Sequence, residues 1–238
     1  MSDPVLLQRE YYRSNADQYD RMHVGCADEH AFALAFLVSM IDFLEIASIL
    51  DIGSGTGRAL LTIKHFHPKL RVVGIEPSPE MRAQGHAKGL TPHELIDGDA
   101  RQISFEDGSF DLVCEFGALH HIPSPRTAVC EMLRVARKGV FISDNNDFGW
   151  GSFASRCAKQ MINACGLWPL AEFVKTRGKG YRVSEDDGIA YSYSVFNDYD
   201  AIARSCKGIH LINTKPSGPN LYRSASHIAL LGLKSLEP

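Results

Sequence analysis

Short apolar runs alternate with stretches of helical spacing from residue 48 onward. The pattern predicts strands over residues 48–52, 71–75, 93–96, 110–114 and 140–143, and helices over residues 58–67, 79–88 and 125–137. Such alternation is typical of parallel strands joined by right-handed crossovers, with helices on both faces. The chain is therefore predicted to be an α/β protein with a doubly wound, mostly parallel sheet.

The two ends of the chain and residues 150–200 depart from this alternation. After a helix over residues 197–206, strands over 209–214 and 227–231 are neighbours and predict an antiparallel edge hairpin, which makes the sheet seven-stranded. Before residue 48, an apolar run with helical spacing ends at Asp42, short of the ~20 residues of a membrane span. We expect one domain, 1–238, divided into N-terminal helices (1–45), a cofactor-binding core (46–144), a substrate cap inserted after strand five (145–200) and a C-terminal helix with edge strands (201–238).

Composition narrows the class of protein. The 238 residues are 45% hydrophobic and 22% charged, a composition that excludes a disordered chain. The net charge of −3 gives the protein no overall positive potential that would attract nucleic acid or an anionic membrane. The six cysteines form no C-x-x-C pair, so we expect buried, reduced thiols in a cytoplasmic protein. The N-terminal residues show no secretory signal.

A glycine-rich turn follows the first strand, where doubly wound sheets bind ligands. It reads Asp51, Ile52, Gly53, Ser54, Gly55, Thr56, Gly57. This G-x-G-x-G spacing differs from the dinucleotide fingerprint, and Arg58 stands where a nucleotide triphosphate site needs lysine. Glu76 ends the second strand, 19 residues beyond Gly57, where a carboxylate can accept both hydroxyls of a ribose.

These motifs together resemble the class I S-adenosylmethionine (SAM)-dependent methyltransferases over residues 11–144. The resemblance implies a Rossmann-like methyltransferase fold with SAM as cofactor, and the turn with Asp51 wrapped around its methionine part. It implies that Glu76 binds the ribose. It places Pro77, Ser78 and Met81 beside the adenine, Asp99 and Ala100 at the adenine edge, and Glu115, Phe116 and Gly117 under the methionine and sulfonium.

The N-terminal segment resembles the mobile helix with which this family closes over the cofactor carboxylate. Tyr11 and Tyr19 are eight residues apart and would share one helical face toward the cofactor. The alternative is an amphipathic helix that only packs on the sheet.

Candidate catalytic residues follow the fourth and fifth strands. His121, His120 and Asp144 are candidates to assist proton removal from a hydroxyl acceptor, with His121 preferred, because imidazole titrates near neutrality. The alternative is that one histidine orders the loop. No metal is expected, since no carboxylate pairs with the histidines at ligand spacing.

Candidate substrate residues lie in the cap. Asn145, Asn146 and Trp150 follow strand five, and the alternative to substrate contact is a turn. Residues 175–182 hold four cations, which suit a phosphate or carboxylate, and nearby tyrosines can stack on a ring. The candidates here are Arg156, Lys179, Tyr181, Arg182, Tyr191 and Tyr193. The alternative is a solvated loop.

The predicted function is methyl transfer from SAM to a polar, anionic small molecule, with oxygen favoured as acceptor. No Asp/Asn-Pro-Pro-Tyr or Pro-Cys motif follows strand four, which argues against a nucleic-acid substrate. RNA- or protein-directed methylation and a non-catalytic SAM-binding subunit remain the alternatives, and an NAD enzyme is disfavoured by the glycine spacing. A small-molecule substrate is the expected partner, without nucleic acid or membrane, and a homodimer is left open.

Overall fold

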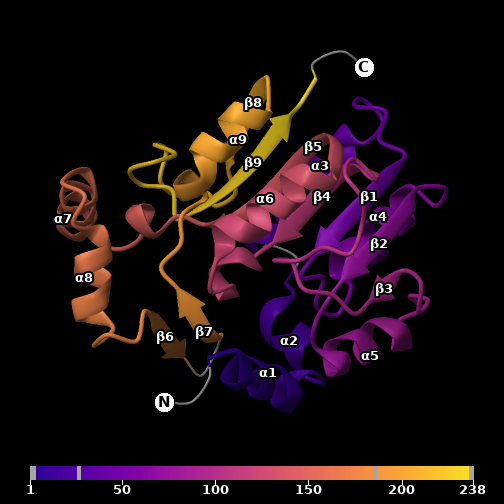
Figure 1. Cartoon of the computed structure of the whole chain (residues 1–238), viewed down its shortest axis with the longest axis horizontal. Helices are drawn as coiled ribbons and strands as arrows, with labels where there is room; N and C mark the ends of the chain where they lie inside the picture. The colour runs from indigo at the N-terminus through magenta and orange to yellow at the C-terminus, as the bar shows by residue number, and fades with distance from the viewer. Residues whose placement is uncertain (1–3, 26–27, 185–186, 236–238) are drawn as a thin grey trace.

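A seven-stranded sheet forms the centre of the computed structural model, which describes residues 4–25, 28–184 and 187–235 (Figure 1). Its strands are β1 (Ser48–Ile52), β2 (Arg71–Ile75), β3 (Leu95–Ile96), β4 (Phe110–Phe116), β5 (Ala136–Asn145), β8 (Gly208–Asn213) and β9 (His227–Leu233). The order is β3-β2-β1-β4-β5-β9-β8. The first five run parallel, while β9 is antiparallel to both β5 and β8. The predicted sheet and its C-terminal edge hairpin are confirmed.

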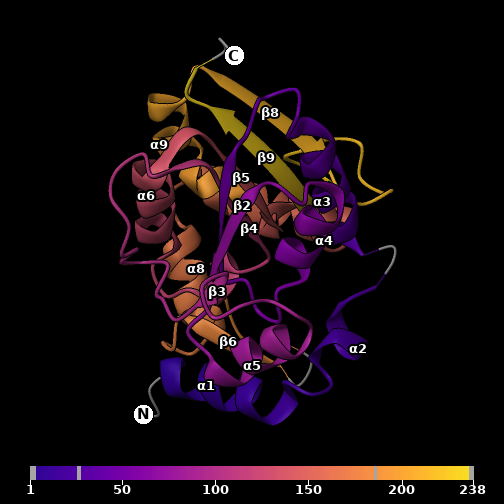
Figure 2. The ribbon, with the colours of Figure 1, turned by 90° about the vertical axis from the view of Figure 1, so that its right-hand side faces the viewer.

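Helices cover both faces of this sheet. Figure 2 shows α6 (Pro125–Val135) and α9 (Tyr199–Ser205) on one side, and α3 (Glu29–Met40) and α4 (Arg58–Phe66) on the other. The helix α5 (Pro79–Ala87) packs near β3. Successive residues of β4 alternate between the two cores, with Leu112 and Cys114 in one and Val113 in the other. Burial on both faces explains why the parallel strands read as continuous apolar runs.

The boundary between α6 and β5 differs from the prediction. We expected this helix to continue to residue 137. The helix instead ends at Val135, and β5 begins at Ala136. Arg137 extends from the strand and pairs with the buried carboxylate of Asp111. Arg137 therefore belongs to the strand and joins β5 to β4 through an ion pair.

The N-terminal segment forms two helices, α1 (Pro4–Asn15) and α2 (Tyr19–His23), with a turn over residues 16–18 between them. Both lie at the edge of the sheet where the parallel strands end (Figure 1). Because the turn breaks the helix, Tyr11 and Tyr19 do not share a helical face, and that prediction is wrong. Among the helices of the described residues, none is long and apolar enough to cross a membrane.

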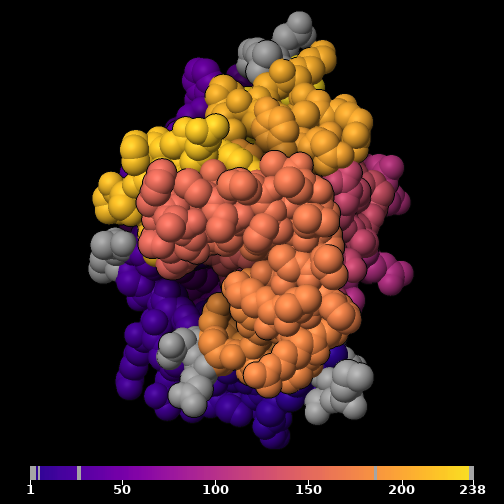
Figure 3. All heavy atoms as spheres, turned by 90° about the vertical axis from the view of Figure 1, so that its left-hand side faces the viewer, coloured from indigo at the N-terminus to yellow at the C-terminus, as the bar shows by residue number. Residues whose placement is uncertain are grey.

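The cap insertion after β5 is also present. It contains the short helix η2 (Asp147–Gly149), α7 (Phe153–Ala164), α8 (Trp168–Lys175), an antiparallel hairpin of β6 (Tyr181–Ser184) and β7 (Gly188–Tyr191), and η3 (Val195–Asp198). In Figure 3 these salmon and orange segments cover one side of the molecule, and a hollow lies between them and the indigo N-terminal segment. Gln8 of α1 accepts a hydrogen bond from the backbone N–H of Ile189 in β7, which joins the cap to α1.

The cysteines only partly follow the prediction. Cys114 and Cys206 are buried, as expected, but Cys130 and Cys165 are exposed, and the five cysteines within the described residues are all free thiols. Cys26 lies outside the described residues.

Candidate functional site

Two adjoining cavities open at the carboxyl ends of the parallel strands. The first, of about 160 Å³, lies between α1 and the ends of β2 and β4, and the second, of about 400 Å³, lies between α2, α3 and the end of β5. Both are lined by Tyr19, Gly53, Gly55, Phe116, Gly117 and His121. Because they share these residues, the two cavities form one cleft at the place where a doubly wound sheet binds its ligand.

The glycine-rich turn forms the wall between the two cavities. Gly53, Gly55 and Gly57 all have positive φ, a conformation that side chains disfavour. A Cβ on Gly53 would lie 2.4 Å from the Cβ of Ala118, so the turn can approach the loop after β4 only because the side chain is missing. Of the other predicted turn residues, Asp51, Ser54 and Thr56 line the second cavity. Burial raises the pKa of Asp51 to about 7.

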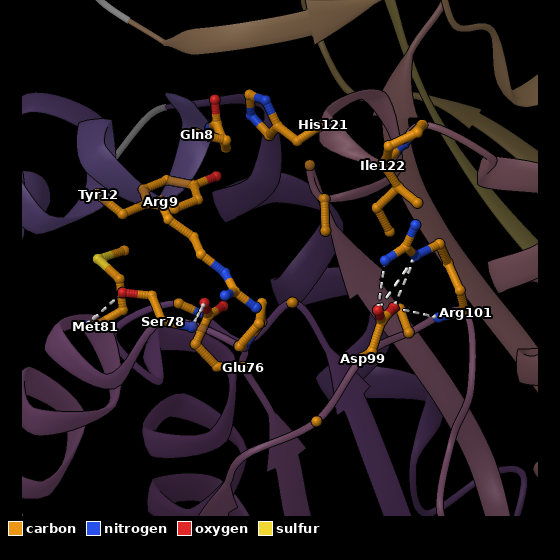
Figure 4. Close-up of a pocket in the computed structure, with 18 of the residues that line it drawn as sticks. Gln8, Arg9, Tyr12, Glu76, Ser78, Met81, Asp99, Arg101, His121 and Ile122 are labelled. Atoms are coloured by element: carbon orange, nitrogen blue, oxygen red, sulfur yellow. Dashed lines mark hydrogen bonds and ion pairs between the residues drawn. The ribbon is translucent and has the colours of Figure 1, made fainter. Parts of the chain in front are cut away.

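Glu76 forms the floor of the first cavity. Its Oε2 accepts a hydrogen bond from the N–H of Gly55 (3.0 Å) and its Oε1 one from the N–H of Ser78 (2.8 Å). Burial raises the pKa of Glu76 to about 7, and these N–H groups oppose the shift. Figure 4 shows Arg9 pointing from α1 toward this carboxylate. The other predicted adenosine residues that line this cavity are Pro77, Ser78, Met81, Asp99 and Ala100.

Glu115 lies beneath the cleft and lines neither cavity. It is fully buried, and its Oε2 accepts a hydrogen bond from the N–H of Ala118 (2.8 Å), which shapes the loop that carries Phe116 and Gly117. Burial, and then the nearby Asp144 carboxylate, raise the pKa of Glu115 well above its usual value. Glu115 therefore affects the cleft only through the shape of this loop.

The helix α1 supplies residues that the sequence analysis missed. Gln8, Arg9 and Tyr12 line the first cavity (Figure 4). The predicted Tyr11 lies outside both cavities, and its hydroxyl is 3.2 Å from Nε2 of His23. Gln8 and Tyr12 are four residues apart and so share a helical face, a signal that could have identified them.

A cluster of two histidines and two aspartates lies at the junction with the second cavity. Nδ1 of His120 is 2.7 Å from Oδ1 of Asp144, and Nδ1 of His121 is 2.5 Å from the carbonyl oxygen of Ile189. The Nε2 atoms of His120 and His121 lie 3.5 and 3.4 Å from the two carboxylate oxygens of Asp187. The expectation that no carboxylate would pair with these histidines is wrong, because the β6–β7 hairpin brings Asp187 to them.

The charges of this cluster shift its proton affinities. Burial by itself would lower the pKa of His120, but the Asp144 and Asp187 carboxylates raise it well above its usual value. The pKa of Asp187 is lowered, because its contacts with His120 and His121 outweigh the effect of burial. Asp144 is fully buried and its pKa is also lowered, since the charge of His120 outweighs desolvation.

The opposite wall of the second cavity holds a further set of ionisable groups. Nε2 of His227 lies 3.1 Å from Oε1 of Glu29, and Nδ1 of His30 lies 3.1 Å from the hydroxyl of Ser143. Burial lowers the pKa of His30 to about 4. The sequence analysis did not single out Glu29, His30 or His227, because they come from segments far apart in the chain.

The predicted substrate residues divide between the cleft and the body of the cap. Asn145 and Trp150 line the second cavity, and Tyr191 lines the first. Asn146 is completely buried, and its amide donates to the carbonyl oxygens of three residues: Leu221, Tyr222 and Ala225. Tyr193 is also buried and donates to Asp198. The turn, which was the alternative for Asn146, is what the structure shows.

The cations predicted to grip an anion lie outside both cavities. Arg182 pairs with Glu172 at 3.0 Å and with Asp147 at 3.5 Å. Arg156 donates to the carbonyl oxygen of Gly151, and Lys179 is exposed. Tyr181 packs edge-on against Tyr191. Acids of the cap already neutralise much of this positive charge, so it gives no support for an anionic substrate.

Comparison with known proteins agrees with the geometry of the cleft. Residues 50–143 match the family model described as a methyltransferase domain. A phosphatidylethanolamine N-methyltransferase from Cereibacter sphaeroides is 40% identical over 105 residues, which cover 42% of this chain and 50% of that protein. The chain thus spans about half the length of this relative.

Two solved structures match over nearly the whole chain. One is a SAM-dependent methyltransferase from Thermotoga maritima, with a TM-score of 0.60 and 17% identity over 96% of this chain and 100% of that one. The other is magnesium protoporphyrin IX methyltransferase from Synechocystis PCC 6803 with bound SAH. Its TM-score is 0.61 and its identity 16%, and the match covers 98% of this chain and 100% of that one.

The fold is that of the class I SAM-dependent methyltransferases. Within it, residues 50–143 are similar to the methyltransferase domain that the family model describes.

Proposed function

We propose that this chain is an enzyme that binds SAM in the cleft and transfers its methyl group to a small molecule. The observation that carries the proposal is the buried carboxylate of Glu76, held between the glycine-rich turn and the start of α5. A carboxylate has about four acceptor positions, so two remain for the hydroxyls of a ribose. The adenosine would then occupy the first cavity, with the methionine part beside Asp51 and Gly53.

The second cavity is where the acceptor would bind. Its volume of about 400 Å³ lies within the usual range for small-ligand pockets. The cap covers this side of the molecule, which favours a small molecule over RNA or protein (Figure 3). The phosphatidylethanolamine and protoporphyrin methyltransferases named above also take small molecules, which supports the same class of acceptor.

We further propose oxygen as the accepting atom. As the new O–C bond forms and the S–C bond breaks, the hydroxyl must lose its proton, and His121, whose imidazole lines both cavities, would accept it. Asp144 would orient His120. The proposal includes no preference for an anionic acceptor, because Arg182 and its neighbouring cations lie away from the cleft.

Two measurements test this function. Calorimetric titration with SAM should show binding of one molecule per chain, with NAD as the control that should not bind. Incubation with methyl-labelled SAM and fractionated cell extract should then place the label in the small-molecule fraction. The absence of SAM binding would refute the whole proposal, and label found exclusively in RNA or protein would refute the class of acceptor.

A further inference from the structure

We propose that His120, His121 and Asp187 bind a divalent metal ion in tetrahedral geometry, of which zinc is the natural candidate. One ligand atom from each of the three residues can be chosen so that all lie within 4.8 Å of one another. Two imidazoles and a carboxylate are a donor set that zinc takes in catalytic sites, where a fourth position stays open.

The hydrogen bonds of the two histidines direct the correct nitrogen atoms to this point. The carbonyl oxygen of Ile189 can only accept, so Nδ1 of His121 donates, and in the neutral ring this tautomer leaves Nε2 as the nitrogen that can bind a metal. Nδ1 of His120 likewise donates its hydrogen bond to the carboxylate of Asp144, which directs Nε2 toward the same point. A carboxylate or carbonyl behind each imidazole is the usual arrangement around a metal-binding histidine, because it fixes the tautomer and the ring.

The spacing of the ligand atoms also fits. With bonds of about 2.0–2.1 Å, two ligands of a tetrahedral ion lie about 3.3–3.4 Å apart. The Asp187 oxygens lie 3.4 Å from Nε2 of His121 and 3.5 Å from Nε2 of His120. Direct hydrogen bonds between charged groups are shorter, about 2.7–2.9 Å. Each histidine thus faces a different oxygen of Asp187 at close to this spacing, and one ligand atom from each of the three residues lies within 4.8 Å of the other two, so the three donors converge on one region of the second cavity.

The position of this site gives the metal a role in the reaction. His120, His121 and Asp187 all line the second cavity, so an open fourth position can face the acceptor. This role, unlike the metal site itself, rests on the proposed function. An oxygen atom of the acceptor bound there would be oriented by the ion, which would also make its proton acidic enough to leave to solvent water as the methyl group is transferred. The two imidazoles would then act as ligands and not as bases.

The test measures metal binding directly on the full chain. The chelator-treated protein is titrated with Zn²⁺ against a chromogenic chelator, and Co²⁺ reports tetrahedral geometry by its visible absorption. Asp187→Asn and His121→Gln each remove one ligand, and Asp144→Asn removes a carboxylate behind a ligand. Asp42→Asn is the matched control, since Asp42 lies 3.4 Å from Nδ1 of His67 elsewhere on the surface.

We expect one Zn²⁺ per chain, and at least about 100-fold weaker binding in each of the two ligand variants. Asp144→Asn should weaken binding by about 10- to 100-fold, and Asp42→Asn by no more than about twofold. Equal zinc affinity in Asp187→Asn, His121→Gln and the wild type would overturn the inference, as would wild-type protein that binds no zinc. SAM binding without zinc binding overturns the metal site alone, whereas zinc binding without SAM binding overturns the proposed function alone.

Discussion

Replacing Glu76 with glutamine exchanges one carboxylate oxygen for an NH₂ group at the floor of the first cavity. Glu76 is 5% exposed, and its two oxygens accept from the N–H groups of Gly55 and Ser78. In Glu76→Gln, the NH₂ group must face one of these donors. The side chain then loses the acceptor on that side, both for the backbone and for one ribose hydroxyl.

The expected loss of SAM affinity follows from this geometry. A hydrogen bond to a charged acceptor contributes about 1.5–3 kcal/mol, which corresponds to about 10- to 150-fold in the dissociation constant. Calorimetric titration with SAM measures the change. Asp107→Asn is the control, because the Asp107 side chain is 81% exposed and pairs with Arg134, away from the cleft. Glu76→Gln protein that is folded and binds SAM within about threefold of wild type would refute the role given to this carboxylate.

The pH dependence of SAM binding provides a second test of the same residue. Burial raises the pKa of Glu76 to about 7, and the ionised form is the one that accepts both ribose hydroxyls. Wild-type affinity should therefore fall as the pH drops below 7, approaching tenfold per pH unit. Glu76→Gln should show a shallower slope, with the remainder due to Asp51. An identical slope in both proteins would show that Glu76 does not couple SAM to a proton.

Three further predictions concern the ligand-free fold, and each is measured by urea denaturation. Because the folded state holds the Glu76 proton more tightly than the unfolded chain, whose pKa is near 4.5, stability from this group falls as the pH rises from about 4.5 to 7. Wild type should lose about 3 kcal/mol relative to Glu76→Gln over that range, and parallel pH profiles would contradict this. Gly53→Ala should lower the free energy of unfolding by about 1–3 kcal/mol, because φ at this position is 63° and the new Cβ would collide with Ala118. Gly180→Ala is the control and should lower it less, because Gly180 also has a positive φ but open space around it. Asn146→Asp should lower the free energy of unfolding by more than about 3 kcal/mol, because it sets a carboxylate against three carbonyl oxygens. Its SAM affinity should stay within about threefold of wild type. Unchanged stability with a raised KM for the acceptor would instead make Asn146 a substrate contact.

The sequence predicted those parts of the cleft that depend on local spacing. The β-branched run at 48–52 and the glycines after it define a strand and a tight turn within ten residues, and Glu76 stands at the end of the next strand. Each of these signals lies inside one strand–turn–helix unit, where period and turn chemistry determine the local structure. The position of the cleft follows from the same topology.

The parts that could not be predicted depend on contacts between distant segments. Asp187 meets His121 only because a hairpin in the cap folds back over the cleft, and nothing in the spacing of these residues encodes that closure. The pairing of Arg182 with Glu172 likewise depends on a contact across the cap and holds this predicted cation away from the cleft. Tyr11 and Tyr19 were placed on one helical face because the break after Asn15, which carries no proline or glycine, leaves no signal in the sequence.

The hydrogen bond from the N–H of Ile189 to Gln8 has a mechanical consequence for the cleft. The helix α1 walls the first cavity through Gln8 and Tyr12, and the hairpin that contains β7 reaches the second through Asp187. Because Gln8 links these two segments, we expect a displacement of α1 to disturb the hairpin as well. If the cleft binds SAM and an acceptor as proposed, cofactor release and acceptor exchange would then be coupled through this contact.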